Sequence, residues 1–275
     1  MKPIQAIVLD LDGTLLNSHK QVSPRNQAAV MALHARGIAV IIATARPLRS
    51  VKCLLPAEWL TLGYQICYNG AFTVNEAVDV YEHLAIPRAT AAEIYRFIKE
   101  QNGSIPVTIE VEDTAYADCI LTDEHRRIFG IPEDVPPLEV ISGTEMETVS
   151  PSKILLANVD GIYSKLKAVF RSKVNIICTD GQELIQIMNK QVSKENALRK
   201  VLDRSGIKAE NTIVFGDDHN DLGLFDLCGI PVAMGNAVEE LKAKAALVTD
   251  TNDRDGVARI LEQWIEYGEG EERNE

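Results

Sequence analysis

The sequence lacks any apolar stretch long enough to cross a lipid bilayer. A membrane-spanning helix needs about 20 consecutive apolar residues, whereas the apolar run that follows Met1 and Lys2 is interrupted at Asp10. The same interruption makes this run unsuitable as a secretory signal peptide. We therefore expect a cytoplasmic protein that does not enter a membrane.

Cysteine is scarce and scattered. The five cysteines form neither a C-x-x-C pair nor the closely spaced framework of a secreted domain; they stand at Cys53, Cys67, Cys119, Cys178 and Cys228. We predict reduced thiols that lie mostly in the core.

Basic residues and aromatic residues are both few. Lysine and arginine number 28 against 40 acidic residues, which gives a net charge of -12, and aromatic residues make up 5% of the chain. No basic stripe with interleaved aromatics offsets this charge, so we expect no nucleic-acid partner. A small phosphate is not excluded, because a local cation or a helix N-terminus outweighs a distant, screened field.

What the sequence does contain is a set of short apolar runs that alternate with segments of helical period. This pattern predicts an α/β fold with a Rossmann-like parallel sheet covered on both faces. One predicted helix spans residues 24–36, with Ser23 as its N-cap, Pro24 in its first turn and Gly37 as its stop. The predicted strands are Ile4–Leu9, Ile38–Ala43, Gln65–Tyr68, Thr212–Phe215, Pro231–Met234 and Ala246–Thr249.

The middle of the chain has a different texture, with paired or alternating strands between helical segments. This predicts an α+β cap domain with an antiparallel sheet, inserted at residues 83–187 into a discontinuous core domain of residues 1–82 and 188–275. The last stretch, residues 266–275, is dominated by Glu and Gly, and we expect a frayed, solvated tail there.

Polar residues follow three of the predicted core strands. Asp10 and Asp12 follow the first, Thr44 and Arg46 the second, and the sequence Gly216-Asp217-Asp218-His219-Asn220-Asp221 follows the strand at 212–215. Parallel strands deliver these groups to one edge of the sheet. If Asp10, Asp12, Asp217 and Asp221 meet there, a proton or a cation must relieve their repulsion. A hard cation with oxygen ligands, Mg²⁺, satisfies that need and also accepts a phosphate oxygen.

Lys194 gives a second indication of an anionic ligand. Ser193 is the expected N-cap of the following helix, so Lys194 stands in the first turn, where a cation opposes the helix dipole. An anion bound between Lys194 and the backbone N–H groups would reverse this unfavourable interaction.

These residues together resemble the haloacid dehalogenase-like hydrolase superfamily, and within it the Cof-type phosphatases with a large inserted cap. The four motifs of that family have counterparts in order: Asp10-Leu11-Asp12-Gly13-Thr14-Leu15, Thr44 with Arg46, Lys194, and residues 216–221. Asn69-Gly70-Ala71 and Ala233-Met234-Gly235-Asn236-Ala237 also resemble stretches of this subfamily.

The resemblance implies a role for each matching residue. Asp10 would attack phosphorus and form an aspartyl-phosphate, while Asp12 would protonate the leaving oxygen and then activate water. The remaining implied roles are phosphate binding by Thr44, Arg46, Lys194 and Asn220, metal binding by Asp10, Asp217 and the backbone carbonyl of Asp12, and support of these ligands by Asp218 and Asp221.

The resemblance thus implies a Mg²⁺-dependent phosphatase, a phosphoric monoester hydrolase, that acts on a small phosphorylated metabolite, with sugar phosphates preferred. Two alternatives remain open. A phosphotransferase or phosphomutase would use the same intermediate, and a low-turnover regulator would only bind the metabolite. We expect a monomer, with a weak homodimer as the alternative.

Two residues depart from the usual motifs. Ala45 stands where many relatives have glycine, and Glu195 follows Lys194 where glycine is common. Because neither removes a reacting group, we expect altered selectivity rather than lost activity. His219 is expected to face solvent or to support the ligands from behind, and Arg126 and Arg127 are expected to form an exposed charged face.

Overall fold

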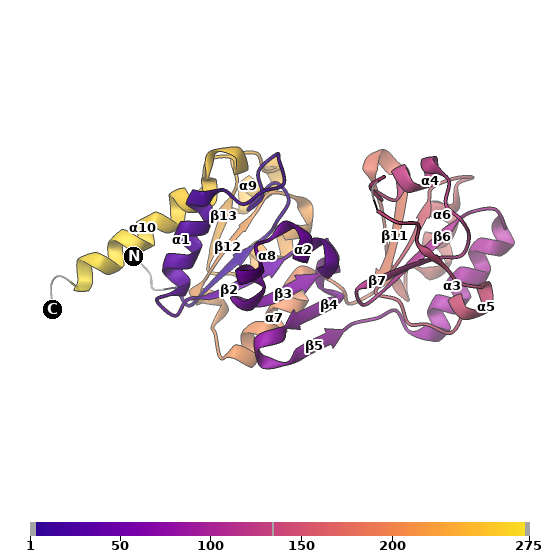
Figure 1. Ribbon diagram of the computed structural model, residues 1–275, viewed down its shortest axis with the longest axis horizontal. Coiled ribbons are helices and arrows are strands. Elements are labelled where there is room, and N and C mark those ends of the chain that lie inside the picture. The colour runs from indigo at the N-terminus through magenta and orange to yellow at the C-terminus, as the bar shows by residue number, and fades with distance from the viewer. Residues whose placement is uncertain (1–3, 134, 273–275) are drawn as a thin grey trace. The chain divides into compact units, whose positions relative to one another are not determined.

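The computed structural model describes residues 4–133 and 135–272, without the side chains at 180 and 267–272. The chain divides into two compact units (Figure 1). One comprises the described residues up to Glu82 together with those from Ser193 onward, and the other comprises His83–Val192. The expected return to the core at residue 188 falls inside a strand, Leu184–Asn189, which pairs within the second unit through Asn189.

The first unit is built on an eight-stranded sheet whose central strands are parallel, as the α/β pattern predicted. Its strand order is β14-β13-β12-β1-β2-β3-β4-β5. The strands are β1 (Ala6–Leu9), β2 (Ala39–Ala43), β3 (Gly63–Cys67), β4 (Phe72–Asn75), β5 (Val80–His83), β12 (Thr212–Gly216), β13 (Ile230–Ala233) and β14 (Leu247–Val248).

Strand β1 occupies the switch point of this sheet. It lies between β12 and β2, both parallel to it, and the chain proceeds outward from β1 to β2 and β3 on one side and from β12 to β13 and β14 on the other. All four residues of β1 are buried, which explains why the strand is continuously apolar. In such sheets, ligands bind beyond the carboxyl ends of the strands at this point.

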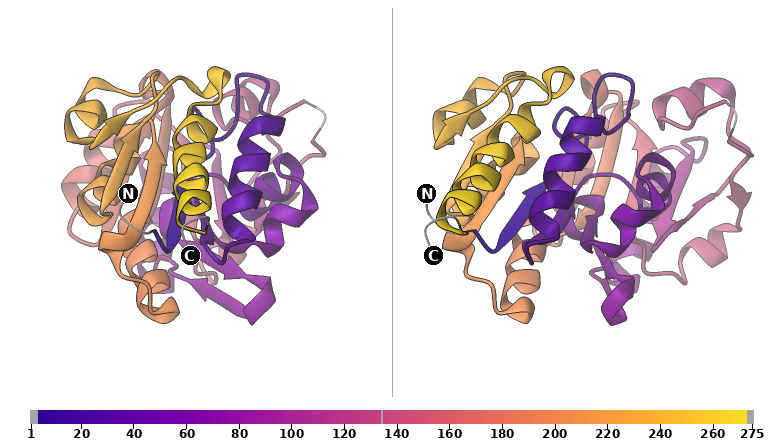
Figure 2. Two further views of the ribbon diagram at one scale, coloured as in Figure 1. Left: turned by 90° about the vertical axis from the view of Figure 1, so that its left-hand side faces the viewer. Right: turned by 60° about the vertical axis from the view of Figure 1, so that its left-hand side comes forward.

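Helices pack against the strands of this sheet. Helix α1 begins as predicted, because the Ser23 side chain accepts a hydrogen bond from Asn26 N, and it packs beside α10 (Figure 2). Helix α10 continues to Glu272, so the expected frayed tail is wrong as far as that residue, and residues 273–275 lie outside the described part. The helices are α1 (Pro24–His34), α2 (Leu48–Leu54), α7 (Lys194–Ser205), α8 (Leu222–Leu227), α9 (Glu239–Lys244) and α10 (Gly256–Glu272).

The second unit is an α+β domain with its own apolar core. Its six-stranded sheet has the order β10-β11-β9-β6-β7-β8, antiparallel except for the β7–β8 pair. The elements are α3 (Arg88–Gln101), β6 (Val107–Val111), β7 (Thr114–Ala117), α4 (Asp123–Ile128), β8 (Glu139–Val140), α5 (Gly143–Met146), β9 (Lys153–Ala157), α6 (Ile162–Phe170), β10 (Val174–Thr179) and β11 (Leu184–Asn189).

Two further expectations concern the whole chain. In the part of the chain that the structure describes, no helix combines the length and apolarity needed to cross a membrane. None of the five cysteines forms a disulfide; Cys67 and Cys228 are buried, and half-buried Cys178 packs against the apolar core of the second unit. Cys53 is exposed because it lies on α2, a short surface helix with two buried residues.

Candidate active site

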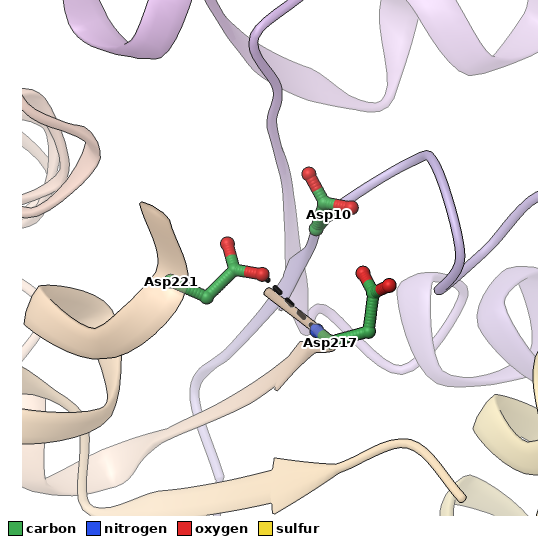
Figure 3. A group of neighbouring side chains, drawn as sticks. All are labelled: Asp10, Asp217 and Asp221. Atoms are coloured by element: carbon green, nitrogen blue, oxygen red, sulfur yellow. Dashed lines mark hydrogen bonds between the residues drawn. The ribbon is translucent and has the colours of Figure 1, made fainter. Parts of the chain in front are cut away.

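Three aspartates converge beyond the carboxyl ends of β1 and β12. Asp10 directly follows β1, Asp217 directly follows β12, and Asp221 precedes α8 (Figure 3). One carboxylate oxygen from each lies within 4.8 Å of one from each of the others. Asp10 is 6% exposed and Asp221 is fully buried. The sequence pattern therefore correctly predicted that these three acids meet at one edge of the sheet.

The buried ammonium of Lys194 partly neutralises this cluster. Its Nζ donates to Asp10 Oδ1 at 2.6 Å and to Asp221 Oδ1 at 2.8 Å. The lysine starts α7, and Ser193 caps that helix by accepting a hydrogen bond from Asn196 N. Burial alone lowers the pKa of Lys194, but Asp10 and Asp221 outweigh this effect and raise it, so the ammonium remains protonated.

Asp221 is held by donors on both of its oxygens. Besides Lys194, it accepts hydrogen bonds at Oδ2 from the backbone N–H group of Asp217, at 3.1 Å (Figure 3), and from that of Asp218, at 3.3 Å. This pattern leaves Asp10 and Asp217 as the acids better placed to bind a cation. It fits the implied role of Asp221 as a support for Lys194 and for the loop after β12.

Burial and the neighbouring acids raise the pKa values of Asp10 and Asp217. Burial raises the pKa of Asp10 to about 8; Lys194 lowers it, whereas Asp221 and Asp217 raise it further. Burial and Asp221 also raise the pKa of Asp217 to about 6, although the Thr14 hydroxyl opposes this. A cation bound at this position would allow both carboxyl groups to ionise, and carboxylate oxygens are the ligands that hard divalent cations prefer.

Gly13 gives the loop after β1 its shape. Its φ is 74°, in the left-handed region, and a Cβ built on it would lie 2.1 Å from Asp217 Oδ2. Glycine is therefore required both by the backbone and by the close approach of the acid. The next residue, Thr14, is buried and donates from Oγ1 to Asp217 Oδ1 at 3.1 Å.

Asp12 points its carboxylate at two cations. Arg46 donates from Nε to Asp12 Oδ2 at 2.5 Å and from Nη2 to Oδ1 at 2.7 Å, and Lys20 Nζ donates to Oδ1 at 2.7 Å. Partial burial raises the pKa of Asp12, but the hydrogen bonds from Arg46 and Lys20 outweigh burial and lower it. The structure thus pairs Arg46, a predicted phosphate ligand, with the predicted acid/base residue.

Thr44 is buried at the end of β2 with its hydroxyl hydrogen available. Its Oγ1 accepts a hydrogen bond from Arg46 N at 3.1 Å, which leaves the O–H group to donate to another partner. Thr44 lines a cleft of about 330 Å³ in this unit. The other residues that line it are Asp10, Asp12, Gly13, Ala45, Asp217, Asp218 and Asn220.

The remaining predicted residues have clear positions. Asp218 is exposed, and its Oδ1 contacts the backbone N–H and the ring Nδ1 of His219. The His219 side chain is itself exposed and faces solvent, as expected. Glu195 lies over Gly223, where a Cβ would be 2.3 Å from its Cδ. It is therefore directed toward α8, and the ammonium of the preceding lysine contacts other acids.

The consecutive arginines Arg126 and Arg127 both bind groups within the second unit. Arg126 donates to the backbone carbonyls of Pro132 and Val135, and Arg127 binds Glu183. Arg127 is exposed as expected, whereas Arg126 is partly buried against the backbone that it binds.

Comparison with known proteins identifies the family. The sequence matches the haloacid dehalogenase-like hydrolase family over residues 7–261. The chain belongs to this family. The family membership and the hydrolase class expected from the motifs are therefore confirmed, and the match spans the core unit and the insert.

Relatives of this hydrolase cover nearly the whole chain. A Bacillus subtilis protein named 5-amino-6-(5-phospho-D-ribitylamino)uracil phosphatase YitU is 29% identical over 267 residues, covering 94% of this chain and 97% of the relative. The protein TM0651 from Thermotoga maritima, whose crystal structure is known, is 28% identical with a TM-score of 0.85; the match covers 94% of this chain and 97% of that chain. The sugar phosphatase BT4131, of subclass IIB, shares the fold with a TM-score of 0.77 at 24% identity, covering 94% and 98%.

Sequence reasoning missed two residues that contact acids of the candidate site, Thr14 and Lys20. Thr14 was part of a quoted motif, and its position beside two aspartates was a usable signal. Lys20 lies eight residues beyond Asp12 in a loop, and nothing in the pattern distinguishes it from any other surface lysine. Its contact depends on how the loop folds back.

Proposed function

We propose that this hydrolase is a Mg²⁺-dependent phosphatase of small phosphorylated metabolites that works through an aspartyl-phosphate on Asp10. The observation that carries the proposal is the buried Lys194 ammonium between Asp10 and Asp221, next to a cleft that Thr44 also lines. A cation, a hydroxyl donor and a cluster of acids at one strand edge suit a phosphoryl group whose charge must be stabilised during transfer.

The proposed reaction has two steps, which use the two acids in different roles. The Asp10 carboxylate attacks phosphorus, the bond to the ester oxygen breaks, and that oxygen takes a proton from Asp12. In the second step, Asp12 removes a proton from a water molecule that attacks phosphorus, the bond between phosphorus and the Asp10 oxygen breaks, and inorganic phosphate and the free Asp10 carboxylate result. Asp10 and Asp12 are two residues apart, so one acid can serve both steps at a fixed nucleophile.

The ion pair between Asp12 and Arg46 adds a requirement to the first step. Arg46 and Lys20 lower the pKa of Asp12, which suits a base but not an acid. An arriving phosphoryl group competes with Asp12 for the Arg46 guanidinium, since both are anions that accept two parallel hydrogen bonds. Partial release of Asp12 would raise its pKa and permit protonation. This competition accounts for Arg46 as both a phosphate ligand and a partner of Asp12.

The donor set fits Mg²⁺. Asp10 and Asp217 offer carboxylate oxygens within one small cluster, and burial raises the pKa of both, so an ion of double charge is favoured there. The Asp12 backbone carbonyl would be the third protein ligand. When bound, Mg²⁺ supplies positive charge beside the phosphoryl oxygens.

A sugar phosphate is the preferred substrate class. The name of the relative YitU describes a ribityl phosphate, an open-chain sugar alcohol ester, and the name of BT4131 describes a sugar phosphatase. Phosphorylated flavin and pyridoxal species form the next class to test. The insert would select the leaving group, while the core unit handles the phosphoryl group common to all of them.

The test is phosphate release from sugar phosphates, a ribityl phosphate, nucleotides, flavin mononucleotide and pyridoxal phosphate, each with Mg²⁺ and with chelator. Wild type is compared with Asp10→Asn and with Asp203→Asn, which removes an exposed acid on α7 as a matched control. We expect metal-dependent release that falls at least about a thousandfold in Asp10→Asn, and unchanged release in Asp203→Asn. Full activity of Asp10→Asn would overturn the mechanism.

The same assay separates the alternatives. Added alcohols or sugars that become phosphorylated in place of water would identify a phosphotransferase. Tight binding of one metabolite with negligible turnover of the whole panel would identify a regulator. Against the latter, both Asp10 and Asp12 are retained, and a protein that only binds needs neither a nucleophile nor an acid.

A further inference from the structure

The turn that follows β3 has an unusual backbone. Tyr68, Asn69 and Gly70 have φ values of 50°, 55° and 104°, three consecutive residues in the left-handed region. For a residue as bulky as tyrosine this conformation is strained, and such strain persists only where surrounding contacts impose it. The turn therefore has partners that hold it, and those partners identify its role.

The backbone of the turn contacts two segments of the candidate site. Tyr68 N donates to Arg46 O at 3.0 Å and Asn69 N donates to Thr44 O at 2.9 Å, so the turn fixes the loop that carries the phosphate-binding residues. Gly70 abuts the start of α7, since a Cβ on it would lie 2.4 Å from the carbonyl oxygen of Ser193. The turn thus joins the loop after β2 to the helix that begins with Lys194.

The Asn69 side chain reaches a third segment. Its Oδ1 accepts a hydrogen bond from Asn220 Nδ2 at 3.1 Å. Asn220 is exposed, in a short turn after β12, and it lines the same cleft as Asp10 and Thr44. An exposed side chain normally samples several rotamers, and holding it in one costs entropy at the time of binding. The hydrogen bond to Asn69 removes that freedom in advance.

The hydrogen bond also leaves Asn220 able to act. Its amide has two N–H donors and a carbonyl oxygen, and Asn69 occupies one donor. The second N–H can still donate to a phosphoryl oxygen. An asparagine is suited to position 69, because it tolerates the left-handed conformation at a lower cost than most side chains and carries an acceptor.

We propose that Asn69 is a positioning residue that orients the Asn220 amide toward the substrate's phosphoryl group. It acts through Asn220 and does not itself touch substrate. This inference rests on the proposed phosphatase function and assigns a role to a residue outside the four motifs.

The test is a double-mutant cycle on Asn69→Gly and Asn220→Ala, measured with the substrate released fastest in the panel. Glycine keeps the left-handed backbone without strain, so Asn69→Gly removes only the side chain. Loss of one hydrogen bond predicts a roughly 3- to 10-fold fall in kcat for Asn69→Gly. In the Asn220→Ala background the same change should alter kcat by less than about twofold, because the two residues act as a unit.

Two controls and a second readout keep the test decisive. Asp79→Gly makes the same kind of change at an exposed left-handed position, where φ is 53°, and should leave kcat unchanged. The side-chain amide signals of Asn220 in ¹⁵N-labelled, metal-free protein report the hydrogen bond without turnover. We expect them to shift and to exchange faster with solvent in Asn69→Gly.

The outcomes distinguish this inference from the proposed function. Multiplicative losses in the double variant, with wild-type turnover intact, overturn the role of Asn69 and leave the phosphatase standing. Absence of any turnover in wild type overturns the phosphatase and, with it, the role of Asn69 toward a phosphoryl group, even where the amide signals show the hydrogen bond to Asn220. Unchanged Asn220 signals in Asn69→Gly would refute it.

Discussion

Replacing Lys194 by methionine should destabilise the protein strongly, and more so at alkaline pH. The ammonium is fully buried and donates to two buried carboxylates at 2.6 and 2.8 Å. Removing one member of a buried ion pair costs about 3–5 kcal/mol, because the partner charge is left uncompensated. Methionine has a similar length and is apolar, so Lys194→Met isolates the loss of charge from the loss of volume.

The pH dependence follows from protonation of the acids left behind. The pKa of Asp10 is already raised to about 8, and loss of Lys194 raises it further. A carboxyl whose pKa is higher in the folded state binds more protons there than in the unfolded chain, so its contribution to stability is lost as pH rises. Each pH unit over which this holds is worth about 1.4 kcal/mol. Below pH 8 wild type and variant both hold this proton, so the difference appears above pH 8, where only the variant still holds it; the cost of Lys194→Met should therefore grow by about 1–2 kcal/mol between pH 8 and pH 9.5.

The assay is urea unfolding of metal-free protein at both pH values, followed by circular dichroism. Lys200→Met is the matched control, since Lys200 lies on the same helix and is exposed, and it should change the free energy of unfolding by less than about 0.5 kcal/mol. A cost below about 1 kcal/mol at pH 8, or an equal cost at both pH values, would refute the reasoning.

Three further predictions concern metal binding and the insert. Because burial raises the pKa of Asp10 to about 8 and of Asp217 to about 6, metal-free protein should lose stability as pH rises through this range; Mg²⁺ should therefore raise the thermal midpoint more at alkaline than at acidic pH, and equal shifts would contradict this. Gly13→Ala, whose Cβ would clash with Asp217 Oδ2, should weaken Mg²⁺ binding at least about tenfold in a calorimetric titration. Binding as tight as in wild type would show that Asp217 is not a ligand. Asp118→Ala removes a nearly buried partner of Lys99 and should destabilise the second unit by about 2–4 kcal/mol, seen as faster hydrogen exchange confined to residues 83–192.

The central strands of the fold were predictable because burial on both faces leaves a continuous apolar run. Strands β1, β2 and β12 have this signature and were found within two residues of their ends. Helix α4 was missed for the opposite reason. It is charged and has no buried residue, and it is held by a capping box at Thr122 rather than by an apolar face. The end of α10 was missed because Glu and Gly give no periodic signal, although an established helix extends one hydrogen bond at a time.

The candidate site was predictable where a residue directly follows a strand of the parallel sheet. Asp10, Thr44 and Asp217 are of this kind, because parallel strands carry their carboxyl ends to one edge. Lys20 and Asn69 are not. Their contacts with Asp12 and Asn220 depend on the path of loops and on left-handed residues, for which the local sequence offers many alternatives. The pairing of Arg46 with Asp12 likewise required the folded arrangement.

The position of β1 in the sheet also constrains the order in which the protein is made. Strand β1 needs β12 as a neighbour, yet more than a hundred residues of insert emerge from the ribosome between them. Because His83–Val192 is contiguous and has its own core, it can fold while the first 82 residues wait for their partner strand. Lys194 and Asp221 emerge later still, so the growing chain assembles the candidate site only after the insert has been synthesised.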